Sequence, residues 1–279
     1  MKTYIKSIIL IIVITFTSCS DVINVDVPVA SPRLVVEASI DWQKGTSGNE
    51  QSIKLTTSTP YFDKEKNNKV QGASVKIIND NDGTEFIFID QKNGNYITSD
   101  FVPVLNQSYT LEIIYNNEVY IAKETMTPVT DVKNITQSIE DEVLEVNLMF
   151  DDPKDIENFY FVKFKERGDL FPELFYESDE FSDGNEMKVV FSKEEDDDST
   201  IQELKPGSIV DIKLHGISKR YYKYIRLMID QSESDGGPFS TTPAPLRGNC
   251  TNQSKPENYA FGYFRLTQVI KTSYTLKQK

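Results

Sequence analysis

From Arg33 onward, apolar and polar residues alternate in short segments that are rich in β-branched and aromatic side chains. In one segment Ile53, Leu55 and Thr57 fall on the same face, because successive side chains of a strand point to opposite sides. Turn residues separate the segments at roughly the 8–12-residue spacing typical of β-sandwiches. The predicted strands cover residues 33–41, 52–59, 73–79, 84–90, 108–115, 118–125, 143–151, 158–166, 186–192 and 208–216. The pattern therefore predicts an all-β fold.

Two of the predicted connections between strands are tight turns. Asn116 and Asn117 form a two-residue hairpin loop, since Asn tolerates the positive φ that such loops need. The Asn-Asp-Gly sequence at 81–83 has the same role. Its acidic residues resemble a calcium loop only in part, because an EF-hand needs further ligands at fixed spacing. A hairpin turn is therefore the preferred interpretation.

One segment shows helical rather than strand periodicity. Tyr221, Tyr224, Ile225 and Met228 follow the i, i+3, i+4, i+7 spacing of a helix with one apolar face, and Ser218 is suited to its N-cap. A Gly-Gly-Pro sequence at 236–238 ends the segment. We expect a short helix over about 218–232.

The strand pattern restarts after Thr127-Pro128, which indicates a boundary between two β-rich parts. Residues 33–127 form the first predicted domain, a β-sandwich. Residues 128–279 form the second, which is mainly β and contains the helix. No repeat of 20–50 residues is evident, which argues against a solenoid or a propeller.

The first 18 residues have the proportions of a secretory signal peptide: two lysines, then an apolar run at 8–16. This run is too short to cross a hydrocarbon core about 30 Å thick. Cys19 follows Ser18 and resembles the acylated cysteine of a bacterial lipoprotein, although Phe16 stands where the usual lipobox has Leu. We predict a signal peptide at 1–18, lipidation of Cys19 and a tether at 19–32. An ordinary signal peptide is the alternative.

The formal net charge of −13 argues against a nucleic-acid partner, which would require a basic face. One His and two Cys are too few for a zinc ribbon or a His-rich zinc site. The sequence also lacks GxSxG, HExxH, Walker and GxGxxG motifs. We therefore expect no enzyme activity and no cofactor. His215 is interpreted as structural and Cys250 as a packing residue; the alternatives are a hydrolase based on His215 or an acidic pair, and a reactive thiol.

The segment 177–198 holds ten acidic residues and two lysines, and its last five residues form an unbroken acidic run. A solvated loop is the preferred interpretation. The alternative is a cation site, since clustered oxygen ligands suit Ca²⁺. Its candidate ligands are Glu194, Glu195, Asp196, Asp197 and Asp198. Ser199, in an Asp-Ser-Thr sequence, is a candidate for O-glycosylation of the kind found in Bacteroidota.

Short motifs in a fixed order resemble the Bacteroidota lipoprotein family defined by domain of unknown function 4249. They lie at 34–37, 72–75, 94–96, 109–111, 181–184, 217–218, 245–250 and 262–264, and the likeness extends over residues 19–270. Cys250 departs from the apolar residue usual after Gly-Asn.

The resemblance implies an outer-membrane lipoprotein with an Ig-like or transthyretin-like β-sandwich and no catalytic residues. Genes of this family often lie beside TonB-dependent transporters. We therefore expect a non-enzymatic accessory protein, anchored by lipid at the periplasmic face or the cell surface, that binds or presents cargo with such a β-barrel transporter. The alternative is a stand-alone surface lipoprotein that binds a glycan, a peptide or a cation.

Overall fold

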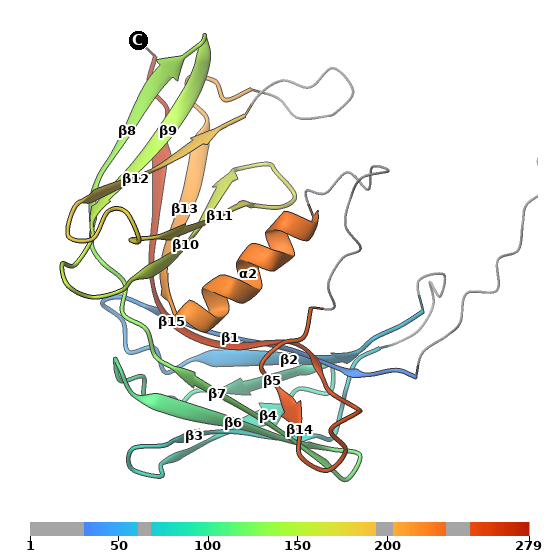
Figure 1. Cartoon of the computed structure of the whole chain (residues 1–279). Coiled ribbons are helices and arrows are strands. Elements are labelled where there is room, and N and C mark those ends of the chain that lie inside the picture. Colours follow the sequence, from blue (N-terminus) through green and yellow to red (C-terminus); the bar gives the residue numbers. More distant parts are fainter. Residues whose placement is uncertain (1–30, 61–67, 194–202, 233–245, 279) are drawn as a thin grey trace, which may run out of the picture. The chain divides into compact units, whose positions relative to one another are not determined.

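The computed structural model describes residues 31–60, 68–193, 203–232 and 246–278. Pro32–Lys279 form one compact unit. The elements in chain order are β1 (Leu34–Gln43), β2 (Gln51–Thr57), β3 (Ser74–Asn79), β4 (Glu85–Asp90), β5 (Asn95–Thr98), β6 (Ser108–Tyr115), β7 (Glu118–Thr125), β8 (Val132–Glu140), β9 (Val143–Asp151), β10 (Phe159–Glu166), β11 (Glu173–Ser178), β12 (Glu186–Ser192), β13 (Ile209–Ile217), α2 (Lys219–Ser232), β14 (Thr251–Asn252) and β15 (Phe261–Thr275). The predicted all-β class is confirmed (Figure 1).

The first part is a β-sandwich. One layer contains β1, β2 and β5, the other contains β3, β6, β7 and β14, and β4 pairs with both β5 and β3. Buried side chains from the two layers meet in one hydrophobic core, for example Val36 and Leu55 from the first layer and Ile77 and Leu111 from the second. Burial of these apolar faces against each other is what stabilises a two-layer arrangement.

The second part repeats this principle with different strands. Strands β11, β10, β13 and the second half of β15 form one layer, and β12, β9 and β8 form the other. Val162 and Leu214 from the first layer pack with Leu148 and Val189 from the second. The predicted alternation matches the burial of β12, whereas β9 and β10 have buried residues on both faces.

Strand β15 belongs to both parts (Figure 1). Its first residues pair in parallel with β1, from Phe261 opposite Val35 to Val269 opposite Gln43. From Val269 to Thr275 it pairs antiparallel with β13. One continuous 15-residue strand thus joins the two sheets.

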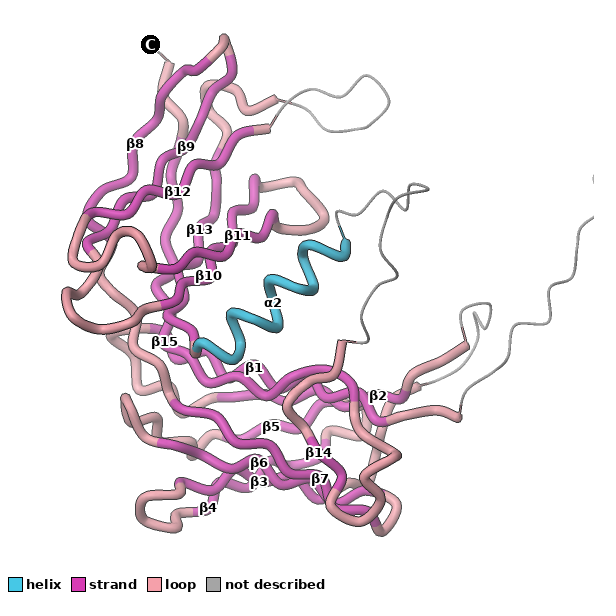
Figure 2. The backbone as a smooth tube through the Cα atoms, in the orientation of Figure 1, coloured by secondary structure: helices cyan, strands magenta, loops and turns pink. Residues whose placement is uncertain are grey.

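Helix α2 is the cyan element beside β10 and β11 in Figure 2. Ser218 caps it: the Tyr221 amide donates to the Ser218 hydroxyl oxygen at 3.1 Å, as expected of an N-cap. The buried residues Tyr221, Ile225 and Ile229 pack against Phe159 and other apolar side chains of the sheet. The helix prediction is confirmed. No helix in the described residues is long and apolar enough to cross a bilayer.

The connection between the two parts passes closely over β13. A Cβ atom at Gly216 would lie 1.7 Å from the carbonyl oxygen of Pro128, so only glycine fits there. Thr127 bridges to Thr267 of β15, and the Val129 amide donates to the Gln268 side chain. Thr127 and Val129 are therefore held against strands, although the ring of Pro128 between them is exposed.

The structure adds strands that the sequence pattern did not predict, namely β5, β8, β11, β14 and β15. Both predicted turns are confirmed, with positive φ at Asn116, Asn117 and Gly83. Strand β12 runs through the acidic segment 177–198, in agreement with the strand predicted at 186–192; the interpretation of the whole segment as a solvated loop is wrong there, because Met187, Val189 and Phe191 pack into a core. The division at 127/128 stays a prediction, although Cys250, Ala260, Phe264 and Leu266 pack into the core of the first part.

Candidate functional site

A buried ionic cluster lies where β1, β13 and β15 meet. The Arg265 Nη2 atom donates to Asp41 Oδ1 at 2.5 Å, and His215 Nε2 lies 3.6 Å from Asp41 Oδ2. His215 Nδ1 lies 3.0 Å from the carbonyl oxygen of Phe161, which accepts the ring proton of the neutral imidazole. The side chain of Asp41 is 29% exposed, whereas Arg265 is 2% exposed and His215 is fully buried.

The charges of this cluster depend on one another. Burial opposes ionisation of Asp41, but the adjacent Arg265 guanidinium holds the pKa of that carboxyl well below its usual range. Burial likewise disfavours the charge of Arg265, but Asp41 raises the pKa of the guanidinium. Burial lowers the pKa of His215. The geometry thus favours a salt bridge beside a neutral imidazole, and the fully buried ring is not accessible to a substrate.

Aromatic rings surround the arginine. The Arg265 Cζ atom lies 5.0 Å from the centre of the Tyr221 ring and 5.8 Å from that of Phe161. A guanidinium at this distance interacts favourably with the face of a ring. The Nε and Nη1 atoms of Arg265 and the Nε2 atom of His215 have no hydrogen-bond partner among the described residues.

A groove of about 1070 Å³ extends from Asp41 across the outer surface of the first sheet. Its apolar wall consists of Ile87, Ile89 and Ile97, which are 52%, 60% and 44% exposed. Ile89 and Ile97 are direct partners on β4 and β5. The remaining charged residues that line the groove are Glu50, Glu85, Asp100 and Lys271. The groove therefore combines an exposed apolar patch with mainly acidic edges.

A second hollow, of about 590 Å³, lies between α2 and the β10–β11 layer. Phe159 and Tyr222 contribute aromatic rings whose centres are 4.8 Å apart. Lys219 and Glu157, on opposite walls, form an ion pair at 2.5 Å. Aromatic surface next to charged and hydroxyl groups is a combination that can bind a polar organic molecule.

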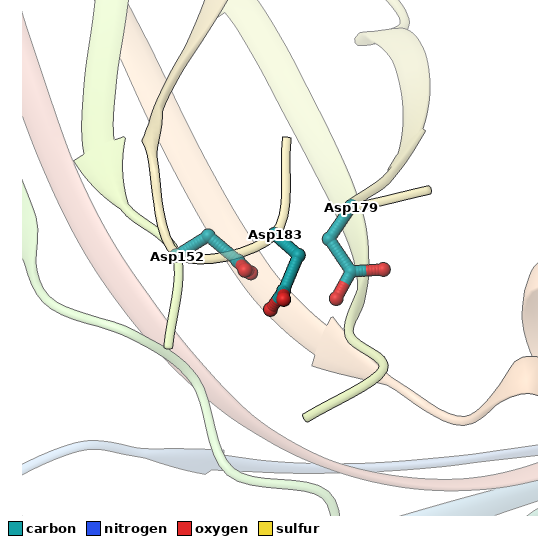
Figure 3. A group of neighbouring side chains, drawn as sticks. All are labelled: Asp152, Asp179 and Asp183. Carbon is teal, nitrogen blue, oxygen red and sulfur yellow. The ribbon is translucent and has the colours of Figure 1, made fainter. Parts of the chain in front are cut away.

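Three carboxylates gather between two turns: Asp152, Asp179 and Asp183 each offer an oxygen within 4.8 Å of the others (Figure 3). Each of the three carboxylates already accepts a hydrogen bond from another group of the protein. Asp152 accepts from the Tyr160 hydroxyl and the Gly184 amide, Asp179 from the Asn158 amide, and Asp183 from the Asp155 amide. These bonds account for the grouping by tying the two turns together.

The predicted site residues Cys19, Glu194, Glu195, Asp196, Asp197, Asp198 and Ser199 lie outside the described residues. Cys250 is buried, and burial raises the pKa of its thiol to about 12, which agrees with a packing role. The sequence pattern missed Asp41 and Arg265. The available signal was Arg265 itself, a charged residue in a run that otherwise reads as a core strand.

Comparison with family models gives one match: the model of a domain of unknown function, DUF4249, matches residues 20–273. Comparison with curated proteins found no match.

Similar solved structures include a cytokine receptor complex, with 9% identity over 68% of this chain and 86% of that chain and a TM-score of 0.26. A two-domain fibronectin type-III segment of chicken tenascin has 14% identity over 60% and 85%, with a TM-score of 0.22. The FN1–FN3 domains of chicken CNTN1 have 11% identity over 65% and 63%, with a TM-score of 0.26. The fold assignment rests on the strand pairing described above.

Proposed function

This chain belongs to the DUF4249 family, and we propose that it is a lipid-anchored, non-enzymatic accessory protein of the bacterial outer membrane. In this proposal it associates with a TonB-dependent transporter and helps to bind or present the cargo of that barrel. Cys19 carries the lipid, at the periplasmic face or at the cell surface. The Bacteroidota lipoproteins that the sequence motifs resemble motivate the assignment of membrane and partner.

The observation that carries the proposal is the groove beside Ile87, Ile89 and Ile97. Exposed isoleucines on adjacent strands form a contiguous apolar surface, and surfaces of this kind mark sites of protein interaction. The acidic edges at Glu50, Glu85 and Asp100 favour a partner segment with apolar and basic side chains. The fully buried His215 adds support, because it offers no accessible base for a hydrolase.

The partner is tested by affinity purification of the full-length chain from detergent-solubilised membranes. We expect a TonB-dependent barrel to co-purify with the wild type. The Ile97→Glu variant should lose it, because a charge would be placed in the apolar wall. Ile139→Glu is the matched control, since Ile139 lies on a strand of the second part and is 45% exposed, against 44% for Ile97. A wild type that purifies alone, or equal loss in both variants, would contradict the proposal.

The anchor is tested separately by metabolic labelling with palmitate. The wild type should be labelled and Cys19→Ala should not. An unlabelled wild type would remove the lipoprotein assignment and leave the groove proposal standing.

The second candidate is a stand-alone surface lipoprotein that binds a glycan, a peptide or a cation. The hollow beside Phe159 and Tyr222 favours it, because aromatic rings next to charged groups suit a sugar. Thermal unfolding with a glycan panel, and with Ca²⁺ or EDTA, separates the two candidates. A ligand that raises the melting temperature, with no co-purifying barrel, supports this second candidate.

A further inference from the structure

Three lysines stand side by side on neighbouring strands of the second part. Lys163 of β10 is the direct partner of Lys213 of β13, and Lys213 is the direct partner of Lys271 of β15. Directly opposite residues of antiparallel strands have their Cβ atoms about 4.5–5.5 Å apart. The register therefore brings three ammonium groups into one row, which we call the lysine row.

The lysine row lacks the neutralising partners that other lysines of this acidic chain have. Lys133 and Lys193, for example, each bind two carboxylates. Among the described residues no salt bridge includes Lys213 or Lys271, and Lys163 has only the longer-range attraction of Asp41 and the Phe161 ring, whose centre is 5.0 Å from its Nζ atom. Like charges at directly opposite positions destabilise a sheet. Such an unfavourable local arrangement is expected where a sequence serves binding rather than stability.

The buried ionic cluster adds positive charge next to the row. Burial, with the repulsion of Arg265, lowers the pKa of Lys163 to about 8, although Asp41 acts in the opposite direction. The carboxylate of this cluster, Asp41, already forms a salt bridge with Arg265. Asp211, two residues from Lys213, is paired with Arg167 at 3.0 Å. The row and the cluster together thus hold four basic side chains and one carboxylate, with His215 neutral.

Open space adjoins the lysine row on two sides. Asp41 and Lys271 both line the groove of about 1070 Å³. A shallow hollow of about 470 Å³ is lined by Lys213, Lys271 and Ser273, and also by Asp211, whose carboxylate is paired with Arg167. Lys213 and Lys271 are exposed and Lys163 is half-buried. A ligand in either hollow can therefore reach ammonium groups of the row.

We propose that the lysine row of Lys163, Lys213 and Lys271 is a binding site for a phosphate group carried by a small molecule or a lipid. A phosphate monoester bears close to two negative charges at neutral pH, and lysine is a common phosphate ligand. Binding supplies the negative charge that the row lacks. The site borders the groove proposed for the transporter partner and shares Lys271 with its lining, but it uses none of the isoleucines of the apolar wall.

The test measures binding of inorganic phosphate to the full-length chain in detergent, by titration calorimetry and by thermal unfolding at constant ionic strength. Saturable binding and a phosphate-dependent rise in melting temperature are expected for the wild type. Lys213→Gln and Lys271→Gln should each weaken binding about tenfold, corresponding to roughly 1.4 kcal/mol. Lys188→Gln is the matched control, because Lys188 is an exposed lysine of β12 outside the row.

The same variants report on folding. Without phosphate, Lys213→Gln should melt no lower than the wild type, because the substitution relieves repulsion between neighbouring ammonium groups. Absence of saturable phosphate binding to the wild type would overturn the proposal. Equal weakening by Lys188→Gln would also overturn it, because general charge screening would then explain the effect.

A second arm identifies the source of the phosphate. Vesicles of phosphatidylcholine with and without phosphatidic acid are sedimented with the chain after removal of its anchor by Cys19→Ala. Sedimentation that requires phosphatidic acid and is lost in Lys271→Gln supports a lipid phosphate. Binding of inorganic phosphate without sedimentation supports a soluble phosphate ester.

Discussion

Replacement of Asp41 by Asn tests the buried ionic cluster most directly. The substitution keeps the size of the side chain but removes the carboxylate that binds Arg265, a residue that is 2% exposed. Loss of one partner from a buried ion pair costs about 3–5 kcal/mol, because the other charge is left uncompensated. Because the guanidinium that is left uncompensated is only 2% exposed, we expect a loss of at least about 3 kcal/mol. For a unit of this size that corresponds to a fall in melting temperature of roughly 6–12 °C.

Removal of the other partner, Arg265, should lower the free energy of unfolding by less. Arg265→Met leaves Asp41 without its partner, but that carboxylate can be hydrated because it is partly exposed. The double variant Asp41→Asn/Arg265→Met removes both charges and should be more stable than Asp41→Asn alone, since neither ion remains buried. Circular dichroism during heating and in urea measures all four proteins. Losses that simply add in the double variant, or a shift below about 2 °C for Asp41→Asn, would refute the reasoning.

Three further predictions concern single residues. Burial lowers the pKa of His215, so as the pH falls the unfolded chain binds a proton at this residue before the folded chain does. The free energy of unfolding should therefore decrease below a pH of about 6.5. Melting temperatures measured between pH 7.5 and 5.5 should fall less in His215→Asn than in the wild type. Gly216→Ala should destabilise the chain by about 3 kcal/mol or more, because the new methyl group meets the Pro128 carbonyl; an unchanged urea midpoint would contradict the packing described for residues 127–129. In a folded Cys19→Ala chain Cys250 should not react with a thiol reagent at pH 8, because burial raises the pKa of its thiol to about 12. It should react once urea unfolds the chain. Rapid labelling of the native chain would show that the thiol is accessible.

Several strands that the sequence predicted have one face in a core and one face toward water, whereas β10 was predicted from its Phe, Tyr and Val content although both of its faces are buried. Strand β3 is an example: buried Val75 and Ile77 alternate with more exposed neighbours. Strand β15 escaped prediction because its residues from Tyr263 to Val269 are buried on both faces. One face meets the apolar core of the first part, and the other carries Arg265 and Thr267, so polar and apolar residues both occupy interior positions.

The candidate sites were predictable to a smaller extent. The structural role assigned to His215 agrees with its complete burial, but nothing local links it to Asp41 and Arg265, which are far away in the chain. The same holds for the lysine row, because its members come from three separate strands and are aligned only by the register of pairing. The apolar groove depends on Ile89 and Ile97 facing away from the core, which alternation alone does not decide.

The parallel pairing of β1 with β15 also sets the order in which the chain can fold. Strand β1 is synthesised long before its partner β15, which lies more than 200 residues later in the chain. Until then one edge of β1 has unpaired amide and carbonyl groups, and exposed strand edges of this kind promote association between chains. A chain truncated before Phe261 would therefore lack β15 and would also leave β1 with an unpaired edge that is prone to association with other chains.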